Sequence, residues 1–148
     1  MPSISHMLWF DTAAKEAADL YTSIFPHSRI TNVSQGPDGQ VFTVNYEILG
    51  ESYIALNGGP QFTFNAAFSI FVNCDGQEEV DHYWDAFIQS GGTPGNCGWL
   101  TDKFGVSWQI VSKQLGEALS QPDPEKAAAA MGAMMKMSKI IIAELPSQ

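Results

Sequence analysis

The sequence carries the same strand-then-helix segment twice, 62 residues apart. In the first copy LWFD (8–11) precedes EAADLY (16–21), and in the second IFVN (70–73) precedes EEVDHY (78–83). A duplicated module therefore accounts for most of the chain. Because half-domains of about 60 residues bury little apolar surface alone, we expect the two modules to share one core. We expect a cleft, and any functional site, along their seam.

Composition favours one folded domain and disfavours nucleic-acid and membrane partners. The 148 residues are 45% hydrophobic and 11% aromatic, enough for the core of one domain spanning 1–148. The net charge of −9 repels phosphate backbones and anionic lipids, so neither nucleic acid nor a membrane is an expected partner. No membrane-length apolar run and no signal-peptide pattern occurs, which predicts a cytoplasmic protein. Cys74 and Cys97 lack CxxC spacing and are expected to be free thiols.

The hydrophobic pattern predicts the order βαβββ in each module. Module one spans about 3–58, module two about 66–111, and a helical extension follows at about 113–142. In module one we expect strands at 4–10, 29–34, 41–48 and 52–56, and a helix to Phe25 capped by Asp11 or Thr12. In module two we expect a strand at 68–73, a helix to about Gln89, and two closing strands at 99–100 and 104–111.

Three helix signals lead to specific expectations. Asp75 and Glu78 have the spacing of a capping box at the start of the second module's helix. Asp123, followed by Pro124, predicts the start of a late helix. The methionines of that region are expected to pack on the sheet or across a dimer seam: Met131, Met134, Met135 and Met137.

The register between the modules has two solutions. A constant offset of 62 pairs the strand at 41–48 with the strand at 104–111. Matching Gly50 with Gly105 instead pairs Tyr53 with Trp108, so that each module ends on its last strand. We favour the second solution, because a difference in loop length between copies is easily tolerated.

A tandem βαβββ repeat resembles the vicinal oxygen chelate superfamily of glyoxalases, ring-cleaving dioxygenases and bleomycin- and fosfomycin-resistance proteins. Five segments look like its PhnB-like branch, whose members often carry the label demethylubiquinone methyltransferase: LWFD (8–11), YTSIFPHSRI (21–30), ALNGGP (55–60), CGWL (97–100) and DKFGVSWQIV (102–111). The resemblance covers about 4–142. It implies an α+β fold with a curved mixed sheet around a central cleft, a C-terminal helix, and a homodimer.

Metal-dependent members of the superfamily hold their ion with His and Glu at three strand positions. Those positions correspond here to Ile4, Ala67 and Gln109. Neither Ile nor Ala binds a metal, and the nearby His6 and Glu47 supply too few converging ligands. The resemblance, applied residue by residue, therefore predicts neither a metal nor another cofactor.

The candidate ligand site comes from inward positions of the first, fifth and last strands. We expect the cleft to be lined by His6, Leu8, Phe10, Ser69, Phe71, Ser107 and Gln109. Neutral polar groups on adjacent strands orient a ligand in an apolar pocket, although they also satisfy one another or a buried water. His6 is either a general base or a solvated side chain of a frayed strand. The loop aromatics Phe62, Phe64 and Trp99 fit either ligand contacts or turn packing.

Three hypotheses for the function remain open at this point. The first is a metal-free protein that binds a small, largely apolar molecule. The second is an enzyme of the glyoxalase type, with metal-assisted isomerase, lyase or transferase chemistry and Gln109 as a weak ligand. The third is methyl transfer, from the family label. A usual S-adenosylmethionine site needs a glycine-rich turn between a strand and a helix, whereas Gly58 and Gly59 run into Pro60.

Overall fold

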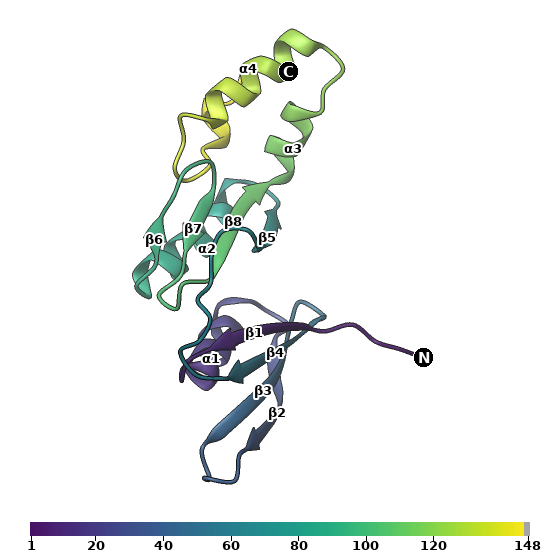
Figure 1. The fold of residues 1–148 in the computed structure, drawn as a ribbon. Coiled ribbons are helices and arrows are strands. Elements are labelled where there is room, and N and C mark those ends of the chain that lie inside the picture. Colours follow the sequence, from purple (N-terminus) through teal and green to yellow (C-terminus); the bar gives the residue numbers. More distant parts are fainter. Residues whose placement is uncertain (147–148) are drawn as a thin grey trace. The chain divides into compact units, whose positions relative to one another are not determined.

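The computed structural model describes residues 1–146 and divides the chain into two compact units, residues 1–64 and the chain from Asn65 onward. Each unit contains a four-stranded sheet with its elements in the order βαβββ (Figure 1). In the second unit the strand β6 (Thr93–Pro94) lies in a stretch where no strand was expected. The two units are the two copies of the sequence repeat. Among the described residues no helix is long and apolar enough to cross a membrane.

The first unit is built on a mixed sheet of strand order β1-β4-β3-β2. Its elements are β1 (His6–Phe10), α1 (Ala14–Ile24), β2 (Arg29–Gln35), β3 (Val41–Ile48) and β4 (Glu51–Asn57). The last strand, β4, runs parallel to β1, and the other pairs are antiparallel. Alternation along β3 is clear, since Val44, Tyr46 and Ile48 are buried while the residues between them are half-buried.

Helix α1 packs on β3 and β4 and covers one face of this sheet. Tyr21 of the helix is buried, and its ring centroid lies 6.1 Å from that of Tyr46 on β3. Tyr46 in turn stacks on Tyr53 of β4 at 5.3 Å. These aromatic contacts identify the buried face of the sheet.

The start of α1 differs from the expectation. Neither Asp11 nor Thr12 caps the helix, because its N-cap is Ala13, which makes no side-chain cap bond. Instead Asn57, at the end of β4, accepts from the Ala14 N–H at 2.8 Å through Oδ1. The Asn57 amide also donates to the Val41 carbonyl at 3.1 Å. One side chain therefore joins the start of the helix to two strands.

The second unit has the sheet order β5-β8-β7-β6, with β5 and β8 parallel and the other pairs antiparallel. Its elements are β5 (Ser69–Cys74), α2 (Gln77–Gln89), β6 (Thr93–Pro94), β7 (Trp99–Thr101), β8 (Ser107–Ser112), α3 (Lys113–Leu119), α4 (Pro124–Met134) and a 3-10 turn (Ile142–Glu144). Helix α2 covers one face, where Phe87 contacts Trp108 of β8 at 4.5 Å between ring centroids.

The expected capping box at the start of α2 is wrong in detail. The N-cap is Gly76, at φ 91°, and it makes no side-chain cap bond. The Asp75 carboxylate accepts instead from Lys113 Nζ at 3.4 Å and Gln114 Nε2 at 3.3 Å. Only the reverse half of the box exists, since Glu79, not Glu78, accepts from the Asp75 N–H at 2.7 Å. The left-handed φ at position 76 turns the chain in a way that glycine tolerates best.

The helices after β8 extend the second unit. Helix α3 continues directly from β8 and packs against α4 (Figure 1). The predicted start of α4 is confirmed, because Asp123 accepts from the Glu125 N–H at 2.9 Å and Pro124 is the first helical residue. The methionines of this region differ in burial, since Met137 is buried, whereas Met131 and Met135 are exposed.

The segment after α4 returns along the second unit and is fastened to it. Gln77 of α2 donates to the Ile140 carbonyl and accepts from the Ile142 N–H, both at 2.8 Å. Lys139 pairs with Asp81 at 3.0 Å and with Asp85 at 3.6 Å. Ile140 between these contacts is fully buried. We call residues 137–142 the C-terminal strap.

The favoured correspondence between the modules is confirmed at the level of strands. In each unit the last strand, β4 or β8, pairs parallel with the first, β1 or β5. The two last strands are therefore equivalent, and β3 has its counterpart in β7. The third strand is shorter in the second unit, Trp99–Thr101 against Val41–Ile48, whereas the connection to the last strand is longer there, 102–106 against 49–50.

Candidate functional site

The open face of the second sheet, opposite α2, brings four of the predicted site residues together. Strand register places Ser69 beside Ser107 and Phe71 beside Gln109. Side chains of directly paired residues share a face, and the Gln109 amide donates to the Ser69 hydroxyl at 3.0 Å. Ser107 is only 5% exposed. Ser69 therefore supports Gln109, and Phe71 and Gln109 reach the surface of a cavity.

That cavity, which we call the β8 pocket, has a volume of about 250 Å³. Its floor comes from the open face of β5, β7 and β8, and its wall from α3 and α4. The lining residues are Phe71, Asn73, Cys97, Trp99, Gln109, Val111, Ser112, Leu115, Gly116, Leu119 and Met134. No residue of this set carries a formal charge. The surface is suited to a neutral, largely apolar molecule.

Strand β8 is positioned by a buried carboxylate. Asp102, 4% exposed in the turn between β7 and β8, accepts from the backbone N–H groups of Phe104 at 2.8 Å and Val106 at 3.0 Å. Its second oxygen accepts from the Trp108 indole at 2.9 Å. Trp108 is the neighbour of Gln109 and points to the opposite face. The Asp102 contacts therefore hold β8 in the register that presents Gln109 to the pocket.

The rim of the pocket at Cys97 is shaped by the C-terminal strap. The backbone N–H groups of Cys97 and Gly98 donate to the carbonyls of Met137 and Ser138, each at 2.8 Å. Cys97 has φ 59°, and a Cβ on Gly98 would lie 2.8 Å from the Ile110 carbonyl oxygen. The close approach explains glycine at 98. The Cys97 thiol lies 3.9 Å from the Met135 sulfur.

The predicted site residues of the first unit lie on the side of their own sheet that α1 covers. Leu8 and Phe10 are 2% and 3% exposed and occupy the buried face of β1, together with Tyr53 and Ala55. They have almost no surface to offer a ligand, and we assign them to the core beneath α1. His6 is exposed on the same side of β1, with its ring 5.4 Å from that of Tyr53.

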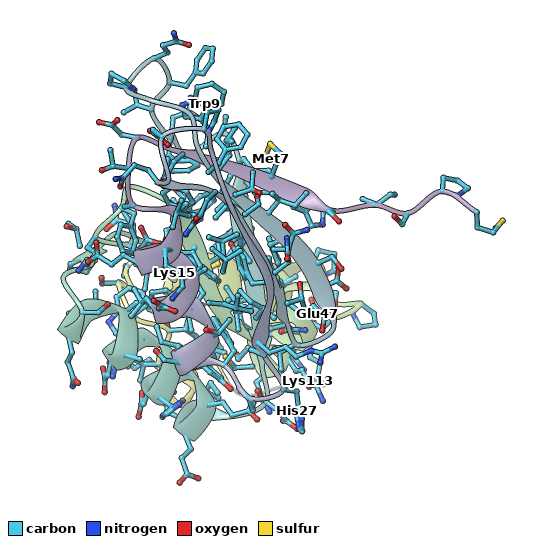
Figure 2. The ribbon with its side chains drawn as sticks, turned by 90° about the horizontal axis from the view of Figure 1, so that it is seen from below. Met7, Trp9, Lys15, His27, Glu47 and Lys113 are labelled. Carbon is cyan, nitrogen blue, oxygen red and sulfur yellow. The ribbon has the colours of Figure 1, made fainter. Side chains whose placement is uncertain are left out.

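The open face of β1, opposite α1, is formed by the residues that alternate with His6, Leu8 and Phe10. Met7 and Trp9 project from this strand (Figure 2), with Met7 exposed and Trp9 half-buried. The repeat places them as the counterparts of Ser69 and Phe71, since 62 residues separate each pair. The repeat therefore predicts Met7 and Trp9, rather than Leu8 and Phe10, for the open face of β1.

The loop from Asn57 to Phe64 packs within the first unit. The Trp9 indole donates to the Gly59 carbonyl at 2.9 Å, and Phe62 meets its ring edge-on at 5.0 Å. Phe64 contacts Phe10 at 5.2 Å. A Cβ at Gly58 would lie 2.4 Å from the Trp9 ring, so only glycine fits there. These two loop aromatics thus make packing contacts.

A larger cavity of about 530 Å³ lies in the first unit, and no predicted site residue lines it. It is bounded by the start of α1 and the turn 36–40, with Asp11, Asp38 and Gln40 among its polar residues. The Asp38 carboxylate already accepts from the Gln40 N–H at 3.0 Å. We prefer the smaller pocket as the candidate site, because an uncharged, largely apolar lining with a few polar side chains, here including Asn73 and Gln109, is typical of ligand pockets.

The residues present do not fit a metal of the superfamily type. Ile4 and Ala67 have no donor atoms, and in residues 1–146 no three His, Cys, Asp or Glu side chains gather closely enough to hold an ion. Glu47 pairs with Arg29 at 3.4 Å. It lies on the open face of β3, whereas His6 lies on the buried side of the sheet. The two side chains therefore do not converge.

Both cysteines are free thiols, in different environments. Cys74, at the end of β5, is buried, and burial, followed by the charge of Glu79, raises the pKa of its thiol to about 12. Cys97 is half-buried on the rim of the β8 pocket. The two thiols therefore differ in their access to solvent.

Two βαβββ units in tandem, each closing with a last strand parallel to its first, define the glyoxalase/bleomycin-resistance fold of the vicinal oxygen chelate superfamily. The family model described as 3-demethylubiquinone-9 3-methyltransferase matches residues 2–111. The chain belongs to this family, in its PhnB-like branch.

Solved structures agree with the assignment. A putative 3-demethylubiquinone-9 3-methyltransferase, PhnB protein, from Bacillus cereus is 29% identical, with a TM-score of 0.68 over 75% of this chain and 99% of that chain. The fosfomycin resistance protein FosX from Listeria monocytogenes is 17% identical, with a TM-score of 0.60 over 81% and 98%. Protein PA1353 from Pseudomonas aeruginosa is 17% identical, with a TM-score of 0.63 over 76% and 98%. The last two show the fold alone. The chain has no significant match among curated proteins.

Proposed function

We propose that this protein binds a small, neutral, largely apolar molecule in the β8 pocket, without a metal. The observation that carries the proposal is the combination of an uncharged lining with the Gln109 amide, which lies between Phe71 and Trp99 on the floor. Apolar walls supply most of the binding free energy in such pockets, and a few polar groups fix the orientation.

Gln109 has hydrogen-bonding capacity left for a ligand. Its amide nitrogen donates to Ser69 at 3.0 Å, and among the described residues its carbonyl oxygen accepts no hydrogen bond. The side chain is half-buried, so a donor on the ligand reaches that oxygen from the pocket. Satisfying a partly desolvated carbonyl contributes about 1 kcal/mol to binding, or roughly fivefold in affinity.

Methyl transfer, which the family description names, has less support from the fold. A usual S-adenosylmethionine site places a glycine-rich strand-to-helix turn under the cofactor. In the first unit the turn from β1 to α1 contains no glycine, and Gly58 is packed against Trp9. Metal-assisted isomerase, lyase or transferase chemistry of the glyoxalase type remains the alternative, with Gln109 as a neutral oxygen ligand.

Binding of benzamide tests the proposal, since it is neutral, apolar on one side and complementary to an amide. Protein-observed NMR should map benzamide to the pocket residues, and Gln109→Leu should weaken binding about fivefold while preserving the fold. Leu119→Trp, which fills the wall, should abolish binding. Unchanged shifts in the pocket, or affinity indifferent to both variants, would refute the proposal. About one metal ion per purified chain, lost in Gln109→Ala, would favour the alternative.

We also propose a homodimer in which α4 contributes to the interface. Met131 and Met135 of this region are 46% and 63% exposed, which is unusual for large apolar side chains so close together. Burying them against a second copy would remove this surface from water. Light scattering should give twice the chain mass, and Met131→Asp with Met135→Asp should give the monomer. A monomeric wild type at micromolar concentration would contradict this proposal.

A further inference from the structure

We infer that the β8 pocket selects a planar aromatic molecule over a saturated one of the same size and polarity, and that Phe71 and Trp99 are the residues that make this selection. The inference rests on the proposed function, because it names the class of ligand for the same pocket. It comes from the positions of three side chains in one row across the sheet.

The row consists of an amide between two aromatic side chains. Register places Phe71 of β5 directly beside Gln109 of β8, and Trp99 of β7 directly beside Gln109 on its other side. All three therefore share the open face, and all three line the pocket. Phe71 is 59% exposed and Trp99 is half-buried, so both rings have free surface.

The distance between strands sets how far apart the Phe71 and Trp99 side chains begin. Neighbouring strands lie about 4.8 Å apart, which sets the roots of Phe71 and Trp99 about 10 Å apart across β8. A flat ring in contact with an aromatic surface on each side needs about 7 Å, which is two van der Waals contacts of about 3.5 Å. A planar ligand above Gln109 can lay a flat face against each of these aromatic side chains, whereas a puckered ring has no flat face to match an aromatic surface.

The surroundings restrict the ligand further. Gln109 lies beneath the gap and meets the edge of the ligand, so that edge needs a hydrogen-bond donor for the free carbonyl oxygen. Leu115, Leu119 and Met134 close the wall with apolar surface, and a thioether beside an aromatic ring is a favourable contact. The lining offers no cation to pair with an anionic ligand, and the chain has a net charge of −9. At about 250 Å³ the pocket takes one ring or two fused rings.

The test compares benzamide with cyclohexanecarboxamide, which carries the same amide on a saturated ring. Wild-type protein should bind benzamide at least fivefold more tightly by NMR titration, since aromatic contacts add to area burial. Trp99→Leu and Phe71→Leu should each remove most of this preference while retaining binding of cyclohexanecarboxamide. Phe62→Leu, an exposed aromatic of the first unit, is the matched control and should preserve the preference. Benzoate should bind more weakly than benzamide in every variant.

The outcomes separate the inference from the proposed function. Equal affinities for the two amides, both reduced by Gln109→Leu, would overturn the aromatic selection and leave the pocket as the binding site. A preference for benzamide that survives Trp99→Leu and Phe71→Leu would also overturn it. Failure of both amides to bind the pocket would overturn the inference and the proposed function together. Replacing Phe71 or Trp99 with leucine removes a ring that has accessible surface, so the fold should stay intact. Thermal melts of each variant check this.

Discussion

Substitution of the buried carboxylate Asp102 should destabilise the second unit more than any exposed change. Asp102→Ala removes the acceptor of three N–H donors, those of Phe104, Val106 and the Trp108 indole. Hydrogen bonds to a charged group contribute about 1.5–3 kcal/mol each, and buried donors left without an acceptor add a desolvation cost. Because the contributions are not additive, we expect a loss of about 3–5 kcal/mol in the free energy of unfolding.

The amide variant separates the contacts of the two carboxylate oxygens. In Asp102→Asn the remaining oxygen keeps the two backbone donors, while the new amide group faces the Trp108 N–H, so that two donors meet. We expect a loss of about 2–3 kcal/mol. Urea denaturation followed by circular dichroism measures both variants, and an unchanged m-value shows that the exposed area on unfolding is the same. Thr101→Ala, an exposed change on the adjacent strand, is the control and should stay within about 0.5 kcal/mol of wild type.

A loss below about 0.5 kcal/mol for Asp102→Ala would refute the assignment of this carboxylate as the support of the β7–β8 turn. The same result would also contradict a role for Asp102 in fixing the register of β8 that turns Gln109 toward the pocket. Indole N–H chemical shifts provide a second reading, since the Trp108 signal should move upfield when its acceptor is removed.

Three further results are expected. Asn57→Ala should cost about 2 kcal/mol, because it removes the cap of α1 and a second hydrogen bond; a cost equal to that of Thr12→Ala in parallel urea melts would contradict the cap. Iodoacetamide at neutral pH should label Cys97 and leave Cys74 unmodified, since burial raises the pKa of Cys74 to about 12; equal labelling by mass spectrometry would contradict its burial. The hydrogen bond from Gln77, and then Lys139, lower the pKa of Asp81 from 3.8. The ionised Asp81 side chain therefore contributes its full stabilisation above pH 3.8, and this contribution is lost as the pH falls through the lowered pKa. Lys139→Met should reduce the thermal midpoint at neutral pH, and this effect should shrink as the pH falls below 3.8 through the lowered pKa; an effect independent of pH would contradict the ion pair.

Local signals in the sequence predicted the elements well where the interacting residues are close in the chain. The strand at 41–48 and the end of α2 at Gln89 agree with the structure, and Asp123 caps α4 as its neighbours indicate. Each of these features depends on side-chain alternation or on a bond to a residue two or three positions away. Such information is present in any short window of the sequence.

The candidate site was predicted in part for the same reason. Ser69, Phe71, Ser107 and Gln109 lie on one face, as expected from their spacing on two strands. Leu8 and Phe10 do not belong to that set, because their repeat counterparts are Ile70 and Val72 rather than Phe71. In a strand, a shift of one residue moves every side chain to the other face of the sheet. The repeat offset of 62 predicts Met7 and Trp9 for the face that corresponds to Ser69 and Phe71.

The sequence by itself determined the duplicated βαβββ order, the family and the alternation of its strands, because these depend on composition, periodicity and short-range spacing. Tertiary structure alone decided which polar groups form hydrogen bonds with one another. Asn57 caps a helix that begins 43 residues earlier, and Gln77 fastens a strap that lies more than 60 residues later. The wall of the β8 pocket likewise joins α3 and Met134 to strands from elsewhere in the chain. Contacts between distant segments depend on how whole elements pack, and no local pattern in the sequence specifies that packing.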